Sequence, residues 1–196
     1  MASDVDIANM ALAHIGSRSN IASLTEDSKE ARKINLFYNT ALAATLEAHD
    51  WAFARKTEQL SESGTPPQTW VYQYAYPNLC AAVRAILPVD RTKTPIPFQV
   101  AHSDIADSKV ILTDEPAAKV RYTAFVTNTT MFSGAFVEAF SAKLASLVAM
   151  PLTGKRTLRD DAVSLFNMLI QTARAVNINE EETGDSYSVP WLDART

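Results

Sequence analysis

The sequence has little of the residue types on which most enzyme sites depend. It contains a single cysteine, Cys80, and three histidines, His14, His49 and His102. One cysteine cannot form an internal disulfide, which fits assembly in a reducing cytoplasm. No histidine has a second His or Cys at the spacing of metal ligands, so the sequence predicts no metal site. We also expect no cofactor, because no dinucleotide fingerprint is present.

Long apolar runs and an excess of positive charge are missing as well. No run approaches the roughly 18 to 20 apolar residues needed to cross a bilayer. The first residues lack the basic start and apolar stretch of a signal peptide. We therefore expect a soluble protein with no membrane contact. The net charge of −4 argues against a protein whose role is to wrap nucleic acid, since such binding rests on clustered Lys and Arg.

What is present favours a folded chain that begins with helices. Hydrophobic residues make up 47% of the chain, enough for a sizeable core. Ser3 and Asp6 form a capping-box pattern, and Gly16 supplies a stop, which predicts a first helix between them. A longer helix is expected from Ser28 to about His49. Its apolar stripe is rich in alanine, which suggests close packing against a neighbouring helix: Ala31, Ile34, Phe37, Ala41, Ala44 and Ala48.

The middle of the chain changes to a period of two. Trp70, Tyr72, Tyr74 and Tyr76 alternate with smaller residues, which favours an extended strand. Shorter apolar or alternating runs follow between prolines and acidic residues, and they predict one small antiparallel sheet with irregular edges: 83–87, 98–101, 110–112 and 120–126.

Helices are expected again after Ser133. One apolar face ends at Pro151 and Gly154, and Thr157 with Asp160 repeats the capping-box pattern. The stripe that follows is the clearest amphipathic pattern in the chain: Leu158, Ala162, Leu165, Phe166, Leu169, Ala173 and Val176.

These patterns predict a mainly α fold. We expect a helical bundle formed by the N- and C-terminal helices, with a small antiparallel β insertion and an extended C-terminal arm. The corresponding ranges are 1–60 for the N-terminal helices, 61–130 for the β-rich insertion, 131–178 for the C-terminal helices and 179–196 for the arm. The helical stripes are expected to supply both the core of the subunit and lateral contacts with other copies.

Each residue group that could carry chemistry has a simpler structural interpretation. Gly154-Lys155 resembles the end of a phosphate loop, but Ala149 stands where a Walker motif has glycine, so a basic turn between helices is expected. Asp160 and Asp161 fit helix capping. Cys80 has no adjacent basic residue and is interpreted as a small core residue. The alternating aromatic residues could stack on bases, but packing in a core or subunit contact is favoured. We therefore predict no catalytic residues.

The composition of the C-terminal arm suggests that it binds a partner. Residues 179–188 are polar and acidic and cannot bury enough apolar surface to fold alone. Large residues follow, so the arm is either an ordinary frayed terminus or a recognition element with Trp191 as its anchor. The predicted partner-binding residues of the arm are Tyr187, Val189, Pro190, Trp191, Leu192 and Arg195.

Several stretches, taken in order, resemble one family. Residues 6–16, with Ala11-Leu12 and Ile15-Gly16, are similar to the opening of the phage head-to-tail adaptors of short-tailed phages, also called tail tubular protein A. Further matching stretches follow along most of the chain, except residues 88–135: Ile21-Ala22-Ser23-Leu24, Glu30-Ala31-Arg32, Phe37-Tyr38, Asp50-Trp51-Ala52-Phe53-Ala54, Tyr74-Ala75-Tyr76-Pro77, Leu79-Cys80 and Trp191-Leu192-Asp193-Ala194-Arg195.

The resemblance implies a structural virion protein rather than an enzyme. Members of that family form a ring, twelvefold in the family, between the portal protein and the tail nozzle, and the ring extends the DNA channel. Their C-terminal segment grips the portal, which coincides with the arm. The resemblance thus implies assembly in a bacterial host cytoplasm and a place at the head–tail junction of the virion. An acidic lumen would let DNA pass without sequence-specific binding.

Two other classes remain open. One is a helical scaffold or binding protein with a non-viral role, which would be a stable monomer or dimer without affinity for portal. The other is a small enzyme with an unrecognised site, which would show converging acids or histidines in a deep pocket. For the adaptor we expect a monomer in dilute solution, because a ring that closed before it met the portal would misassemble.

Overall fold

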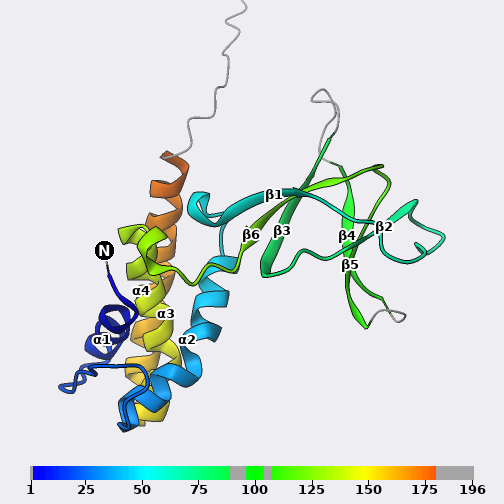
Figure 1. The fold of residues 1–196 in the computed structure, drawn as a ribbon. Coiled ribbons are helices and arrows are strands. Elements are labelled where there is room, and N and C mark those ends of the chain that lie inside the picture. Colours follow the sequence, from blue (N-terminus) through cyan, green and yellow to red (C-terminus); the bar gives the residue numbers. More distant parts are fainter. Residues whose placement is uncertain (1, 89–95, 104–106, 180–196) are drawn as a thin grey trace, which may run out of the picture.

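The chain folds into a layer of helices and, beside it, a group of strands (Figure 1). The structure is a computed structural model, and it describes residues 2–88, 96–103 and 107–179, with side chains described as far as Val176. The arm residues Tyr187, Val189, Pro190, Trp191, Leu192 and Arg195 lie outside the described residues.

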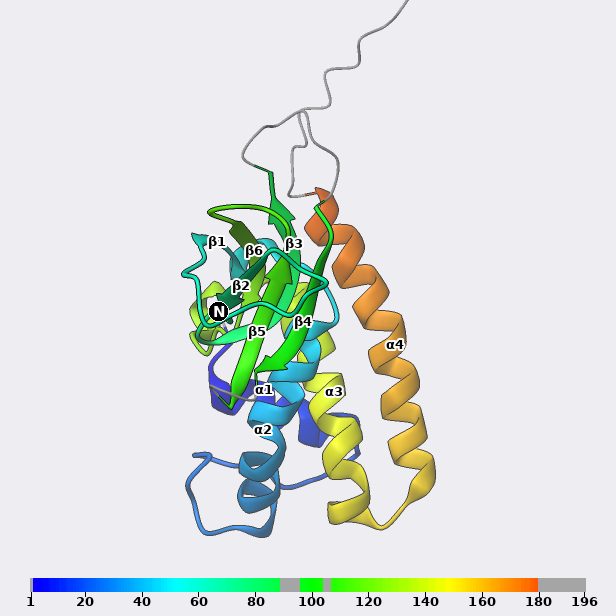
Figure 2. The ribbon, with the colours of Figure 1, turned by 90° about the vertical axis from the view of Figure 1, so that its right-hand side faces the viewer.

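In the described part of the chain, four α-helices make up the helical layer, and serine side chains cap the start of three of them. Ser3, Ser28 and Ser133 each accept a hydrogen bond from the backbone of the first turn, and Asp6 completes the predicted capping box at Ser3. Figure 2 shows α3 in the centre, with α2 on one side of it and α4 on the other. The helices are α1 (Asp4–His14), α2 (Lys29–Glu47), α3 (Gly134–Thr153) and α4 (Arg156–Asn179).

The central helix α3 is the most buried element of the layer. Its 20 residues are long and apolar enough to cross a membrane by composition, with a mean hydropathy of 1.4, yet 61% of the window is buried inside the protein. Phe136, Phe140 and Leu144 are fully buried. Their burial between α1, α2 and α4 accounts for the apolar composition of the helix. Pro151 lies inside its last turn, and Gly154 ends it at φ +68°.

The alanine-rich stripe of α2 is covered by the same chain. Ala31, Ile34 and Ala41 are fully buried against the helical core, as are Leu42 and Leu46. The close packing predicted for this stripe is confirmed, with α3 of the same chain as the neighbouring helix, although Phe37, Ala44 and Ala48 are only partly buried.

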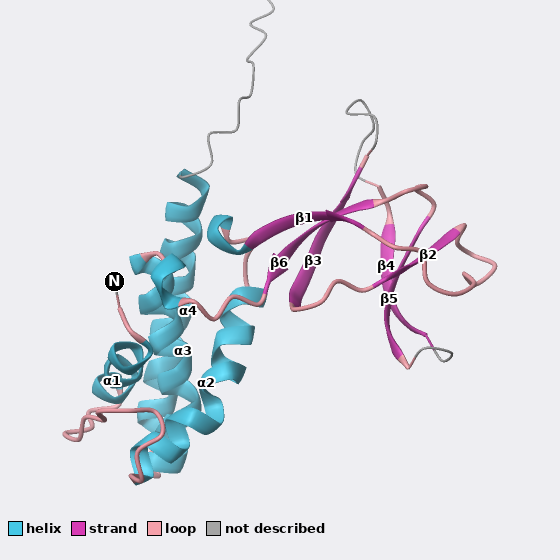
Figure 3. Cartoon of the chain, in the orientation of Figure 1, coloured by secondary structure: helices cyan, strands magenta, loops and turns pink. Residues whose placement is uncertain are grey.

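The expected fold class is also wrong. The protein is 47% helical and 22% strand, a mixed α/β fold with two three-stranded antiparallel sheets rather than a mainly α bundle with one small sheet (Figure 3). The strands are β1 (Arg55–Gln59), β2 (Tyr72–Ala75), β3 (Cys80–Leu87), β4 (Phe98–Ser103), β5 (Ser108–Thr113) and β6 (Lys119–Ala124), with short 3-10 turns at Ala52–Ala54 and Thr129–Met131.

Two single bridges join the sheets into one closed circuit of strands. The sheet orders are β1-β6-β3 and β2-β5-β4. Ile86 of β3 bridges Ile96 just before β4, and Tyr74 of β2 bridges Glu62 just after β1. The residues that flank β1 and β4 thus connect the outer strands of the two sheets, an arrangement that approaches a small barrel. Tyr74, Ile111 and Val120, all fully buried, lie in its core.

Strand β1 accounts for part of the wrong prediction. Its sequence, Arg55-Lys56-Thr57-Glu58-Gln59, has no apolar residue and shows no alternation, so the range 1–60 was expected to be helical. It is a strand because β6 pairs with it along its whole length, from Arg55 opposite Thr123 to Gln59 opposite Lys119. Pairing with a distant segment overrides local preference here.

Candidate functional site

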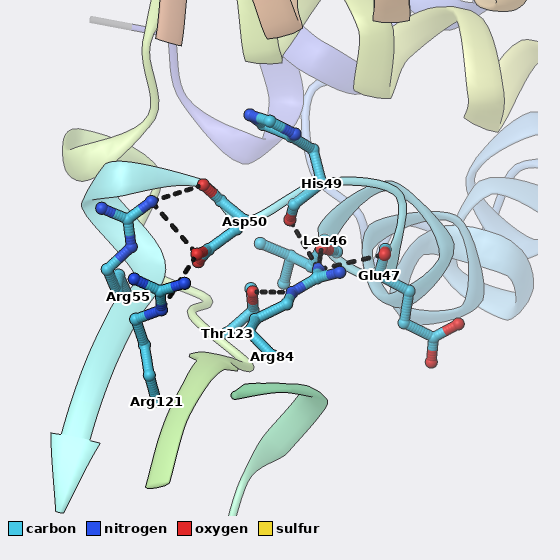
Figure 4. Close-up of polar contacts among 8 residues, drawn as sticks. All are labelled: Leu46, Glu47, His49, Asp50, Arg55, Arg84, Arg121 and Thr123. Atoms are coloured by element: carbon cyan, nitrogen blue, oxygen red, sulfur yellow. Dashed lines mark hydrogen bonds and ion pairs between the residues drawn. The ribbon is translucent and has the colours of Figure 1, made fainter. Parts of the chain in front are cut away.

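The helices and the strands meet at the C-terminal end of α2, and an arginine holds that end. Arg84 of β3 donates through Nη2 to the carbonyls of Leu46 (3.0 Å), Glu47 (3.0 Å) and His49 (2.6 Å). Its Nε donates to Thr123 Oγ1 of β6 at 2.9 Å (Figure 4). One side chain thus ties the end of α2 to two neighbouring strands.

A second arginine reaches the same helix end from α4. Arg174 of α4 donates through Nη2 to the carbonyl of Ala48 at 2.6 Å. The last carbonyls of a helix have no partner within the helix and carry the negative end of its dipole, so two guanidinium groups stabilise this end. We call this region the joint: residues 46–50 together with Arg55, Arg84, Arg121 and Arg174.

Asp50 is the half-buried carboxylate of the joint, whereas Glu47 is exposed. Asp50 Oδ2 lies 3.1 Å from Arg55 Nη2 and 3.6 Å from Arg121 Nε, and the Asp50 side chain is only 19% exposed. Half-burial lowers the pKa of the Arg84 guanidinium, and the carboxylates of Asp50 and Glu47 oppose that change. An arginine remains charged under such conditions, so the joint is a permanent network of cations and carbonyls.

A cleft of about 510 Å³ opens beside the joint. Ala43 and Glu47 of α2 form one wall, and Tyr76, Leu79 and Cys80 are among the residues of the other. The Cys80 thiol donates to Tyr76 Oη at 3.3 Å. The cleft thus lies between the two structural parts of the chain.

Leu79 stands out at the rim of this cleft. Its side chain is 73% exposed, and its backbone has φ +52°, a left-handed conformation that costs a non-glycine residue about 1–2 kcal/mol. Strained backbone conformations are common at functional positions, so the exposed Leu79 is a candidate contact residue.

The chemistry of the cleft favours binding over reaction. Burial raises the pKa of the Cys80 thiol, although the hydrogen bond to Tyr76 opposes the change, and burial likewise raises the pKa of Tyr76. Both groups therefore stay protonated near neutral pH, and the thiolate that a nucleophile needs is disfavoured. The cleft suits an apolar group better than a substrate that must be attacked.

The described part of the chain also leaves large apolar side chains in solvent. Helices α2, α3 and α4 contribute five of them, and the others lie on strand β4, in loops and in the 3-10 turn at Thr129–Met131. The set is Leu36 (64% exposed), Val71 (59%), Leu79 (73%), Val100 (42%), Met131 (49%), Met150 (41%), Val163 (41%), Met168 (60%) and Val176 (39%).

The three histidines do not form one site, and each makes a separate structural contact. His14, at the end of α1, has Nε2 3.2 Å from Ser141 Oγ, and burial lowers its pKa, so the neutral ring is favoured. The His49 ring packs edge-on against Trp51. The exposed His102 lies 3.5 Å from Asp107 Oδ1. Among the described residues, no group of three or more His, Cys, Asp or Glu side chains could hold a metal ion.

The other candidates take structural places. Gly154-Lys155 forms the turn between α3 and α4, where the Lys155 backbone donates to Thr153 Oγ1. The predicted capping box of Thr157 and Asp160 is wrong, because α4 already begins at Arg156 and Asp160 forms an ion pair with Arg159. Tyr74, from the alternating aromatic residues, is fully buried and donates to the carbonyl of Glu115, so the interpretation as core packing is confirmed.

Sequence reasoning missed the residues that build the joint and the cleft. Arg84 and Arg174 act on helix carbonyls that are 35 or more positions away, and no local pattern marks such contacts. Leu79 follows Pro77-Asn78, a turn-forming pair, but its positive φ has no signature in a leucine.

Comparison with known proteins adds no relative to this picture. No protein-family model matches the chain, and a search of the curated proteins gives no match.

Proposed function

We propose that this chain is a head-to-tail adaptor subunit of a tailed bacteriophage or prophage. In this proposal its copies assemble into a ring between the portal and the tail nozzle, DNA passes through the lumen, and residues 179–196 bind the portal. The order of short motifs shared with the adaptor family supports the proposal from the sequence side.

The observation that carries the proposal is the incomplete burial of α4. The apolar stripe of α4 leaves its last member, Val176, 39% exposed, and Met168, outside the stripe, is 60% exposed. An apolar helix flank that the described chain does not cover is typical of a surface that another polypeptide covers. A subunit whose function is assembly needs such a surface, whereas an enzyme or a monomeric scaffold does not.

The position of α4 also suits the arm. Helix α4 runs away from its turn with α3 and ends at Asn179, beyond the joint that Arg174 helps to form (Figure 1). In a ring with parallel helices, every subunit would present residues 180–196 from the same end. That arrangement would direct all the arms toward a single partner, the portal.

The cleft bears on the competing enzyme hypothesis. Its thiol and phenol are held protonated by burial, and its rim carries the exposed Leu79. These properties favour an apolar contact with another protein over a reaction with a small substrate.

Removal of the arm tests the proposal. A variant ending at Ile178 keeps the described core, so we expect it to fold with the far-UV circular dichroism of the full chain and to lose binding to the portal protein of its phage. Light scattering with and without portal measures both assembly and binding. Unchanged portal binding by the truncated chain would contradict the role of the arm, and failure of the full chain to bind portal would contradict the adaptor function.

A further inference from the structure

One side of the sheet β1-β6-β3 is turned away from the core between the strands. Val120 and Tyr122 of β6 are buried in that core, so the residues that alternate with them lie on the other side. Thr123 on this side accepts a hydrogen bond from Arg84 of the joint. Residues directly paired in antiparallel strands share a side. This side, which we call the basic face, consists of Arg55, Thr57 and Gln59 of β1 and Lys119, Arg121 and Thr123 of β6.

The basic face begins at the joint and opens to solvent beyond it. Thr123 is buried at the joint, whereas Thr57, Gln59 and Lys119 are exposed. Arg121, between them, has a side chain that is 41% exposed. From Thr123 to Lys119 the face extends over four residues of β6, about 13 Å. It therefore offers a solvent-accessible strip of polar and cationic side chains.

Cations outnumber carboxylates on this face and in the joint. One carboxylate, Asp50, serves both Arg55 and Arg121. Lys56 and Glu58 lie on the other side of β1 and offset each other. The negative end of the α2 dipole adds only about half a charge, so the excess stays positive and favours an acidic ligand. The cations are Arg55, Arg84, Lys119, Arg121 and Arg174, against the carboxylates of Glu47 and Asp50.

An acidic segment of the same chain starts beside this face. Arg174 holds the last part of α4 at the joint through the carbonyl of Ala48, and Asn179 follows five residues later, about 7.5 Å along the helix. No Asp or Glu occurs between Asp161 and Glu180, yet the next six residues carry four: Glu180, Glu181, Glu182 and Asp185. Carboxylates just after a helix are disfavoured by the dipole, so cations nearby are needed to stabilise them.

The length of the segment suits the face. An extended chain covers at most about 3.3–3.6 Å per residue, so residues 180–185 cover about 20 Å and exceed the length of the strip. We infer that residues 180–185 bind the basic face of their own chain, with carboxylates beside Arg55, Lys119 and Arg121. The contact goes beyond the proposed function, because it fixes where residues 187–195 leave the folded body. It can be measured without portal, so its failure leaves the adaptor function to be judged separately.

A cysteine pair tests the contact. The variant carries Thr57→Cys on the basic face and Thr183→Cys in the acidic segment, in a Cys80→Ser background, and it is oxidised at low protein concentration. We expect a disulfide within one chain, seen as a faster band on non-reducing gels and as a monomer by mass spectrometry. Raising the salt to about 0.5 M should slow the reaction, because salt screens exposed charges. Disulfides formed mainly between copies, or a rate that salt does not change, would overturn the inference.

A neutral segment provides the matched control for tethering. The same cysteine pair is combined with Glu180→Gln, Glu181→Gln, Glu182→Gln and Asp185→Asn, which keep the length of the segment and remove its charge. The rate of cross-linking should fall by about three- to ten-fold, the effect of two or three exposed ion pairs. An unchanged rate would mean that the tether alone brings the cysteines together, and it would overturn the inference.

Two lysines provide the control for position. Lys119 and Lys56 are both exposed and lie on paired strands, but only Lys119 belongs to the basic face. In the cysteine-pair background, Lys119→Glu should slow cross-linking by about two- to five-fold, whereas Lys56→Glu should leave the rate unchanged. Far-UV circular dichroism checks that both variants fold. Equal effects of the two substitutions would contradict the basic face as the binding surface.

Discussion

Replacement of Arg84 by methionine tests whether the joint holds the helices and the strands together. Methionine keeps much of the length and apolar stem of the side chain but removes the guanidinium. The variant leaves the carbonyls of Leu46, Glu47 and His49, and Thr123 Oγ1, without this donor. The unfolding free energy should therefore fall.

The size of the effect follows from the geometry. A hydrogen bond from a charged donor contributes about 1.5–3 kcal/mol. Three of the acceptors share the single nitrogen Nη2, so their contributions do not add, and the half-buried position lets water replace part of the loss. We expect Arg84→Met to lower the unfolding free energy by about 2–4 kcal/mol. With a urea slope of roughly 2 kcal/mol per molar, the unfolding midpoint would fall by about 1–2 M.

Two further variants calibrate the measurement. Arg32→Met removes an arginine whose ion pair with Asp27 is exposed, at 67% and 91%, and should change stability by less than about 0.5 kcal/mol. Arg174→Met removes a single bond to the same helix end. Because Arg84 and Arg174 stabilise neighbouring carbonyls, their effects should couple by more than about 0.5 kcal/mol in a double-mutant cycle. Stability of Arg84→Met within about 0.5 kcal/mol of the unmodified protein would refute the role of the joint.

Two other predictions use the same urea assay. Leu79→Gly should stabilise the protein by about 0.5–1 kcal/mol, because glycine accepts φ +52° without strain, whereas Leu79→Ala keeps the strain and should bring no gain; equal stability of the two variants would show that the strain is not released. Burial lowers the pKa of His14 below its ordinary 6.5, so the unfolded chain binds the proton more readily, and stability should fall as the pH drops below about 6.5. His14→Gln should remove that part of the pH dependence, and an unchanged pH profile would refute it.

Local chemistry in the sequence predicts the ends of the helices well. The capping box of Ser3 and Asp6, the serine cap at Ser28 and the glycine stop at Gly154 are all present in the structure. Each depends on side chains that satisfy backbone groups within a few residues, so the pattern and its physical cause lie in the same short window.

The strands were harder to predict because their cause is not local. The polar β1 pairs with β6 residues 60 to 68 positions away, and the connection between the two sheets depends on bridges such as Ile86 with Ile96. The candidate site was missed for the same reason. Arg84 and Arg174 were ordinary charged residues in the sequence and gained their roles only when α2, β3 and α4 came together. The sequence predicts the amphipathic stripe of α4 but not which residues of the helix stay exposed, since that depends on which flank faces α3.

The closed circuit of strands affects how copies of this protein behave when many are held side by side. A free strand edge offers unpaired N–H and C=O groups that a strand of another molecule can join. Here the bridges from Ile86 to Ile96 and from Tyr74 to Glu62 occupy part of those edges. Adjacent molecules would thus have fewer free edges at which their strands could pair. Strand exchange between subunits would therefore be suppressed. Contact between copies would then depend on side chains, and a contact of that kind can dissociate without any change in the strand pairing.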